Sequence, residues 1–394
     1  MFKAACHSDN KQIIIKYMKQ LKHIIRNGLL ALLPVVLFFG LLEGAARIVE
    51  LWRPPMRVDI GQGFGAESLL FRPVGGGFME THPDKLDSFQ QQRFVMPKPD
   101  RTLRIFALGG SSVNYLEYEF GLLAQELEKA WPQRFDSVEV INCGGLSYGS
   151  HRLVLIAAEI LHYAPDLVLL YSGHNEFEEL QQLHLANIEF ASAQRTLGRS
   201  ALYRFIRDTV ARREISALKE EHARRKLATS IPDTSKTWAY EFTPDEVKTR
   251  MDAYRDNLTS IIRMCAENGV PVVIGTVPSN LCTPNLPGRD GERYEEVRRL
   301  LAAERYEEGA ALGRAILRNA TPRHQSSDVE NAVIRQVADE LHVPLADVEK
   351  AVEAAEPNHV PGETLFSDHC HLNAAGNRIL RQVYQETILQ TLEF

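Results

Sequence analysis

The chain has 394 residues, of which 44% are hydrophobic and 24% are charged, and its net charge at pH 7 is −6. This balance allows a substantial buried core and excludes disorder on a large scale. The acidic balance gives no electrostatic footprint for nucleic acid as a partner. The five cysteines form no Cys-x-x-Cys pair, so they indicate neither a structural zinc site nor a disulfide scaffold.

An uninterrupted apolar stretch follows the amino-terminal segment. Residues 28–42 are apolar, and a helix that continued toward Trp52 would reach the length of a bilayer span. The segment before it is rich in basic residues, namely Lys3, Lys11, Lys16, Lys19, Lys22 and Arg26. This excess predicts a membrane anchor over residues 28–52, with residues 1–27 in the cytoplasm and the rest outside it, in the periplasm or at the cell surface. A cleaved signal peptide is the main alternative, and a buried core helix is the third.

After the anchor, residues 53–96 are expected to act as a linker that wraps around the main domain. Pro54 and Pro55 end the helix, and a Gly-rich irregular stretch is expected over 61–77. From residue 97 to residue 394, apolar runs alternate with segments of helical periodicity, which is typical of a parallel sheet with helical crossovers.

The expected elements of this domain follow one another regularly. Strands are expected at 103–108, 138–142, 167–171, 272–276 and 344–348. Helices are expected at 120–131, 152–162, 247–268, 291–318 and 329–341, with a last helix capped by Asn373.

One long helical insertion, at about 178–242, interrupts the alternation between the third and fourth strands. Its charged run over 212–226 mixes both signs, which predicts a solvated helix. Because the insertion leaves the sheet at the edge where the strands end, we expect either a lid or a substrate-binding subdomain. A plain surface excursion is the alternative.

The residues that predict chemistry lie at opposite ends of this domain. Ser111 directly follows the first strand, at the edge where open α/β sheets place their sites. A serine hydroxyl needs a histidine base within hydrogen-bond reach, and that histidine is usually held by a carboxylate. Asp368 and His371 could supply both groups. The pattern predicts a Ser-His-Asp triad.

Two further segments lie between these residues and also follow expected strands. The first is Asn142-Cys-Gly-Gly-Leu-Ser147 and the second is Gly173-His-Asn175. With Gly-Gly-Ser111 before them and Asp368-His-Cys-His371 after them, they resemble the four sequence blocks of the SGNH (GDSL-like) hydrolase superfamily. The resemblance covers roughly residues 97–394.

The resemblance implies a three-layer α/β/α, flavodoxin-like fold with a parallel sheet, and it assigns roles to residues. Ser111 would be the nucleophile, and Asp368 and His371 would complete the triad. Asn175 and a backbone amide of the second block would form the oxyanion hole. That amide is expected at Gly144 or Gly145, with Ser147 as a further candidate.

The chain departs from the family pattern at three positions. Gly110 replaces the Asp of Gly-Asp-Ser, and Glu176 replaces the Asp that often follows the Asn of the third block. Ser147 stands near the place of a second glycine in the second block.

The function that the resemblance implies is that of a serine esterase acting on an ester or O-acylated substrate. If a sugar hydroxyl replaced water, the same site would be an O-acyltransferase acting on a cell-surface glycan. A membrane-tethered binding protein with an inactive triad is the alternative from another class.

No cofactor and no metal are expected. Adjacent residues of an extended Asp368–His371 segment point to opposite sides, which argues against a metal cluster there. The segment Gly109-Gly-Ser-Ser112 lacks the Lys of a P-loop, which argues against a phosphate-binding loop.

Overall fold

The computed structural model describes residues 32–53, 69–177, 197, 200–206, 209, 244–286, 288–320 and 324–392. The chain divides into two compact units. The first unit comprises Met1–Met56 and Phe190–Ala223, and the second comprises Arg57–Glu189 and Arg224–Phe394. Most of the expected insertion, including the charged run 212–226, lies outside the described residues.

The second unit is built on a sheet of five parallel strands. These are β4 (Thr102–Gly109), β5 (Ser137–Gly144), β6 (Leu167–Tyr171), β7 (Val272–Gly275) and β8 (Leu345–Ala346). The strands lie in the order β5-β4-β6-β7-β8. Every residue of β4, β6 and β7 is buried, as a parallel sheet covered on both faces requires. This order is that of flavodoxin-like folds, so the expected fold class is confirmed.

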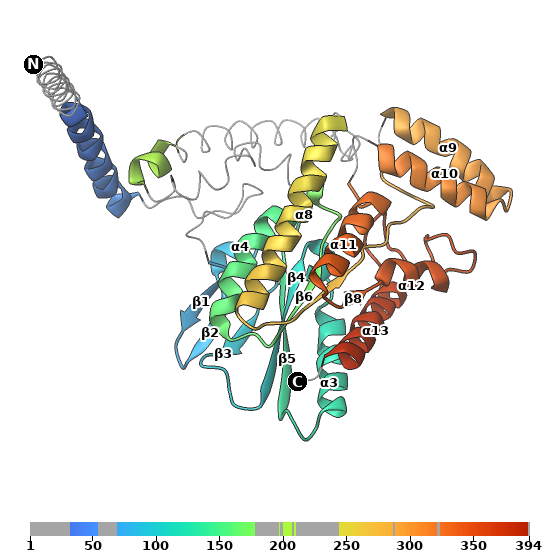
Figure 1. The fold of residues 1–394 in the computed structure, drawn as a ribbon, viewed down its shortest axis with the longest axis horizontal. Helices are drawn as coiled ribbons and strands as arrows, with labels where there is room; N and C mark the ends of the chain where they lie inside the picture. The colour runs from blue at the N-terminus through green and yellow to red at the C-terminus, as the bar shows by residue number, and fades with distance from the viewer. Residues whose placement is uncertain are drawn as a thin grey trace, which may run out of the picture. The chain divides into compact units, whose positions relative to one another are not determined.

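Helices cover both faces of this sheet (Figure 1). One face carries α4 (Ser150–Ile160), α8 (Pro244–Glu267) and α11 (Asp328–Leu341), and the other carries α3 (Glu117–Ala130), α12 (Val348–Ala355) and α13 (Ala374–Thr391). In the sheet, β5 lies on one side of β4 and β6 lies on the other. Because crossovers between parallel strands are right-handed, the crossover helices before and after β5 lie on opposite faces of the sheet. The gap between the ends of β4 and β6 is therefore the point where a ligand site is expected.

Two helices stand apart from these layers. A helical hairpin of α9 (Gly288–Ala302) and α10 (Tyr306–Asn319) follows β7. Its buried side chains form small apolar clusters of their own, including Tyr294, Val297 and Ile316.

A small antiparallel sheet precedes β4. It consists of β1 (Phe71–Val74), β2 (Phe78–Thr81) and β3 (Arg93–Val95). Phe71 and Phe94 pack edge to face, with ring centroids 5.0 Å apart. The buried Glu159 of α4 accepts the amides of Leu70 and Phe71 at 2.6 and 2.9 Å. Residues 71–74 thus form a strand inside a stretch that was expected to be irregular, because Phe71 is buried in the main core.

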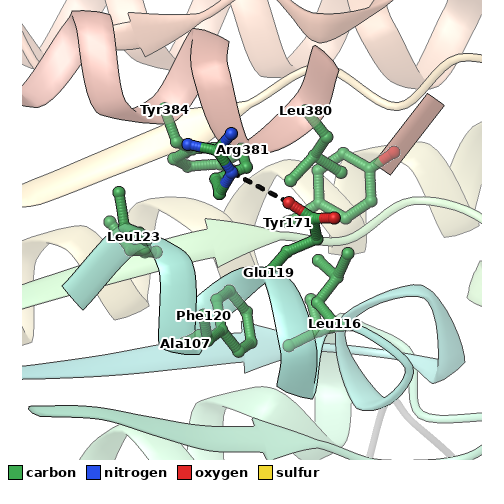
Figure 2. A pocket seen from close by; sticks show the side chains of 11 residues that line it. Ala107, Leu116, Glu119, Phe120, Leu123, Tyr171, Leu380, Arg381 and Tyr384 are labelled. Carbon is green, nitrogen blue, oxygen red and sulfur yellow. Dashed lines mark hydrogen bonds and ion pairs between the residues drawn. The ribbon is translucent and has the colours of Figure 1, made fainter. Parts of the chain in front are cut away.

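A small pocket opens between α3 and α13, next to the sheet (Figure 2). Its walls are mostly apolar and include Phe120, Tyr171 and Leu380. Glu119 and Arg381 also line it and form an ion pair, in which Arg381 Nε donates to Glu119 Oε2 at 2.8 Å. None of Ser111, Asp368 and His371 lines this pocket.

The described part of the first unit contains a long apolar helix, Leu32–Trp52, with a mean hydropathy of 1.9. The helix continues past Gly44 to Trp52, as expected. Only 6% of its most apolar window is buried, so it is not a buried core helix. A second, short helix in this unit covers residues 201–206.

Candidate active site

Ser111 lies at the turn between β4 and the short helix α2 (Ser111–Asn114). The turn is tight because the preceding strand ends in glycine. A Cβ atom on Gly109 would lie 2.2 Å from the carbonyl oxygen of Tyr171 on β6, so no other residue fits there. At this turn the Ser111 hydroxyl lies 2.7 Å from His371 Nε2 and can donate a hydrogen bond to it.

His371 comes from the loop before α13, which begins after its cap Asn373. Its Nδ1–H donates to Asp368 Oδ2 at 2.7 Å. The other carboxylate oxygen, Oδ1, accepts the backbone amides of Cys370 at 2.8 Å and His371 at 2.7 Å. The loop therefore holds the carboxylate against the ring with three hydrogen bonds.

These hydrogen bonds decide the charge of Asp368. Burial alone would raise the pKa of this carboxyl, but the hydrogen bonds from the His371 ring and from the amides of Cys370 and His371 outweigh it. The pKa of Asp368 is therefore held well below its ordinary value. Asp368 is thus negatively charged throughout the neutral range.

Asn175 follows β6 and lies against the backbone that carries Ser111. A Cβ atom on Gly110 would lie 2.2 Å from Asn175 Nδ2, so glycine is what permits this approach. Asn175 Nδ2 donates one hydrogen bond to the carbonyl of Tyr148 at 3.1 Å. A side-chain amide has two N–H donors, so a second one is available beside Ser111.

The two glycine amides expected in the oxyanion hole already donate within the protein. The amide of Gly144 donates to Asn142 Oδ1 at 2.9 Å, and that of Gly145 donates to the carbonyl of Gly109 at 3.0 Å. Both amides therefore already have an acceptor in this conformation. Ser147, the further candidate, has a φ of 62°, the left-handed region in which glycine is favoured. This explains why a glycine would suit that position.

His174, the neighbour of Asn175, is buried and neutral. Burial, followed by the nearby rings of His371, His369 and His324, lowers the pKa of His174 to about 3. Its Nδ1 accepts the backbone amide of Ser326 at 3.1 Å, which places the ring proton on Nε2. Among the described residues, Nε2 has no hydrogen-bond partner.

The loop that carries Asp368 is held by Asn280, which follows β7. Asn280 Nδ2 donates to the carbonyl of Asp368 at 3.0 Å, and its backbone amide donates to the carbonyl of His369 at 3.1 Å. Its Oδ1 accepts the amides of Cys282 and Thr283, both at 2.9 Å. Asn280 is 1% exposed. Sequence reasoning missed this residue, for which the only signal is its place just after the fourth strand.

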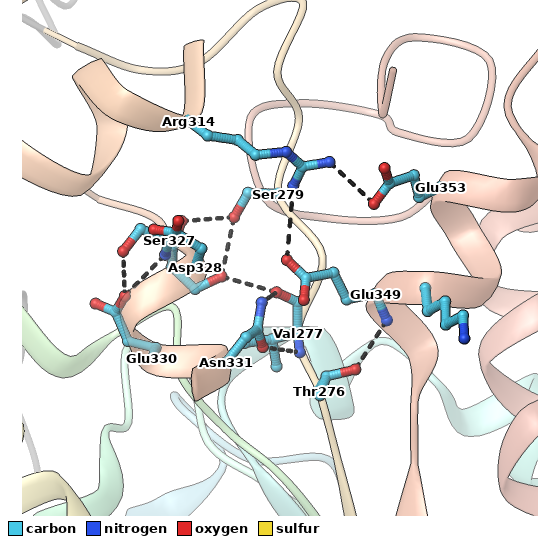
Figure 3. Close-up of polar contacts among 12 residues, drawn as sticks. Thr276, Val277, Ser279, Arg314, Ser327, Asp328, Glu330, Asn331, Glu349 and Glu353 are labelled. Carbon is cyan, nitrogen blue, oxygen red and sulfur yellow. Dashed lines mark hydrogen bonds and ion pairs between the residues drawn. The ribbon is translucent and has the colours of Figure 1, made fainter. Parts of the chain in front are cut away.

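A polar network fixes the segment before Asn280 (Figure 3). Asn331 of α11 accepts the amide of Val277 at 2.8 Å and donates to its carbonyl at 2.9 Å. Ser279 Oγ donates to the carbonyl of Ser326 at 2.7 Å. Because Ser326 also contacts His174, one network connects the segments after β6 and β7.

Glu176, in the segment after β6, is held by contacts with α4 and α8. This fully buried carboxylate accepts the amide and hydroxyl of Ser150, the first residue of α4, at 2.8 and 2.7 Å. It also forms an ion pair with Arg250 of α8 at 2.5 Å. These contacts join the segment after β6 to α4 and α8.

The structure thus brings Ser111, Asn175 and the pair Asp368 and His371 together from three separate segments. It engages the amides of Gly144 and Gly145 elsewhere. Asp368, Cys370 and His371 also place ligand-type atoms within 4.8 Å of one another. In that group, however, His371 Nδ1 donates a hydrogen bond to Asp368 Oδ2. These two atoms therefore orient the ring of His371 in this conformation.

No family model matches the chain, and no curated protein matches it. Among solved structures, the chain is similar to the acetyl xylan esterase AlAXEase, with 15% identity, a TM-score of 0.39 and coverage of 73% of this chain and 100% of that chain. It is similar to a GDSL-like lipase from Bacteroides thetaiotaomicron VPI-5482, with 10% identity, a TM-score of 0.38 and coverage of 73% and 89%. It is also similar to an acetylxylan esterase from Geobacillus stearothermophilus, with 14% identity, a TM-score of 0.38 and coverage of 74% and 95%.

Proposed function

We propose that this protein is a serine ester hydrolase of the SGNH (GDSL-like) type. The observation that carries the proposal is the continuous hydrogen-bonded chain from Ser111 Oγ through the ring of His371 to Asp368, with both contacts at 2.7 Å. This is the arrangement that turns an unreactive hydroxyl into a nucleophile.

The reaction proceeds by acyl transfer in two steps. His371 Nε2 takes the proton of Ser111 as Oγ attacks the ester carbonyl carbon. The carbonyl oxygen becomes a negatively charged oxyanion. The alcohol oxygen then leaves with the proton from His371, and the acyl group stays on Ser111. In the second step, water loses a proton to His371 and attacks the acyl carbonyl carbon. The bond from that carbon to Ser111 Oγ then breaks, Oγ takes the proton back from His371, and the carboxylic acid is released.

Two kinds of group stabilise charge along this path. Asp368 stays ionised and stabilises the imidazolium that forms when His371 takes the proton. We expect the oxyanion to be held by the second N–H of Asn175 and the amide of Ser111, with Ser147 as the further candidate for a backbone donor. Removing one such donor typically lowers kcat by about 10²–10³-fold.

We also propose that the helix Leu32–Trp52 crosses a membrane. Its 21 residues, at about 1.5 Å per residue, extend about 30 Å, which is close to the thickness of the hydrocarbon core. The basic residues that precede it favour an amino terminus in the cytoplasm and an ester site on the opposite side of the membrane.

Labelling of the full chain in detergent with a fluorophosphonate tests the ester hydrolase. We expect labelling that is lost in Ser111→Ala and kept in Ser112→Ala, which removes the neighbouring hydroxyl and is the matched control. Absence of labelling in a folded sample, or equal labelling in Ser111→Ala, would contradict the proposal.

Turnover of short aryl esters then identifies the acceptor. A burst followed by steady turnover is expected for a hydrolase that uses water. A burst with almost no turnover, relieved by an added sugar, would instead identify an O-acyltransferase with the same acyl-enzyme.

A further inference from the structure

The apolar helix Leu32–Trp52 carries a charged stripe over its last turns. Glu43, Arg47 and Glu50 are spaced by four and three residues, so they lie on one face of the helix. Charged side chains within a membrane-spanning helix are costly unless they find partners inside the protein. The uninterrupted apolar run therefore ends at residue 42, too early for a bilayer span unless the stripe is covered.

The short helix 201–206 and the preceding Ser200 contact the two carboxylates of this stripe, Glu43 and Glu50. Glu43 accepts three hydrogen bonds at the start of the short helix: from Ser200 Oγ at 2.7 Å, from the amide of Ala201 at 2.9 Å and from the amide of Leu202 at 3.0 Å. The first amides of a helix have no partner within it, so a carboxylate from the long helix acts as their cap. Arg47 in turn pairs with Glu43 at 2.8 Å.

A second contact joins the short helix to the end of the long helix. Arg204 donates from Nε and Nη2 to the two oxygens of Glu50 at 2.8 and 2.7 Å, a bidentate geometry. The side chains of Arg204 and Glu50 are only 9% and 17% exposed. Ala46 and Ala201 are also buried in this unit, and small side chains allow helices to approach closely.

Both the long helix and the insertion segment carry exposed apolar side chains near their contact. Leu197, Phe205 and Ile206 project from the insertion segment, and Leu51 and Trp52 project from the end of the long helix. Aromatic and aliphatic side chains of this kind are typical of segments at the boundary between lipid headgroups and acyl chains. Because this surface continues that of a helix long enough to cross a bilayer, lipid is the occupant that it fits.

We propose that Leu197 and residues 200–206 of the insertion bind the membrane surface, docked on the last turns of the anchor through Glu43 and Glu50, with Phe205 and Ile206 in the lipid. This inference rests on the proposed membrane span. It gives the insertion a role in anchoring, because the docked helix supplies partners inside the protein for Glu43 and Glu50 of the long helix.

Tryptophan quenching in vesicles tests the proposal. The full chain is reconstituted into phosphatidylcholine vesicles after replacement of its three tryptophans, Trp52, Trp131 and Trp238, by Phe, and a single tryptophan is introduced by Phe205→Trp. We expect lipids brominated near the headgroup to quench this tryptophan more than lipids brominated deep in the chains. Tyr118→Trp in the same background, at a side chain 75% exposed in the second unit, is the unquenched control.

A third variant, which keeps only Trp52, separates the span from the docked segment. Quenching of Trp52 without quenching at position 205 overturns the inference while the span stands. Absence of quenching at both positions overturns both, and neither result affects the fluorophosphonate test of Ser111. Emission at position 205 that is blue-shifted, concentration-dependent and insensitive to bromine would show a second copy on this surface and would also overturn the inference.

A charge exchange tests the docking contact itself. Arg204→Glu places two carboxylates together and is expected to lower the quenching at position 205 at least two-fold. Glu50→Arg combined with Arg204→Glu is expected to restore it. Unchanged quenching in Arg204→Glu would show that the pair does not hold the segment.

Discussion

Gly110 and Asn175 are in direct contact, because a Cβ atom on Gly110 would lie 2.2 Å from Asn175 Nδ2. The SGNH pattern that the chain resembles has Asp at this position. Here the absence of a side chain lets the amide of Asn175 lie directly beside the backbone that carries Ser111. The substitution in the motif is thus coupled to the placement of a proposed oxyanion donor.

Gly110→Ala is expected to displace Asn175 and to lower kcat for aryl esters by about 10²-fold, as loss of one oxyanion donor does. KM should change little, since the donor acts mainly on the transition state. Asn175→Ala should produce a loss of similar size, and the double variant should be little worse than either single one. Full additivity of the two losses would contradict the coupling.

Asn280 is expected to act as a positioning residue. Asn280→Ala removes the donor to the carbonyl of Asp368 and should lower kcat and the rate of fluorophosphonate labelling by about 10–100-fold, because small misplacements of catalytic groups are costly. KM should remain nearly unchanged. The readout is kcat and KM, measured separately in folded protein.

Thr283→Val is the matched control for Asn280. It removes the hydroxyl that also accepts from Asn280 Nδ2 at 2.7 Å but leaves the contact with Asp368 in place. Activity close to that of the parent is expected. An equal loss in both variants would mean that Asn280 supports the fold of this loop rather than the position of Asp368.

His174 should make the protein less stable in acid. Its pKa falls from 6.5 to about 3 on folding, so the unfolded chain binds a proton in a range where the folded state does not. This contribution to stability is complete above pH 6.5 and is lost as the pH falls toward 3. At pH 5 the loss amounts to about 2 kcal/mol.

Urea unfolding of the parent and of His174→Asn at pH 7 and pH 5 measures this effect. Asn keeps an acceptor for the amide of Ser326, and the variant should lose about 2 kcal/mol less than the parent between the two pH values. His162→Asn, at an exposed histidine, should behave as the parent does. The same pH dependence in the parent and in His174→Asn would contradict the assignment.

Glu176 should matter for stability more than for chemistry. Glu176→Ala removes the buried carboxylate that pairs with Arg250 and binds Ser150, which typically costs about 3–5 kcal/mol. Glu176→Gln with Arg250→Met should recover much of this, since the buried charge leaves with its partner. The measurement is the free energy of unfolding, with labelling of Ser111 retained in the folded fraction. As a control, the surface substitution Lys248→Ala should leave the free energy of unfolding nearly unchanged.

Much of the fold could be predicted from local patterns. The strand Leu167–Tyr171 is an apolar run bounded by polar residues, and the last helix begins at an Asn that caps it. Such signals depend on neighbours within a few residues, so their bounds could be predicted closely. The strand at Phe71–Val74 could not, because only distant contacts, such as that with Phe94, bury its aromatic ring.

The sequence by itself determined which residue types stand in the short motifs. Ser111 and Asn175 follow apolar strands, and Asp368 and His371 stand just before the last helix. The tertiary structure decided how their hydrogen bonds are shared. The amides of Gly144 and Gly145 are engaged, Asn280 holds the loop of Asp368, and Glu43 caps the helix at Ala201. Each of these contacts joins groups that different parts of the chain bring together, or depends on the backbone conformation there. Local periodicity carries no information about which donor meets which acceptor.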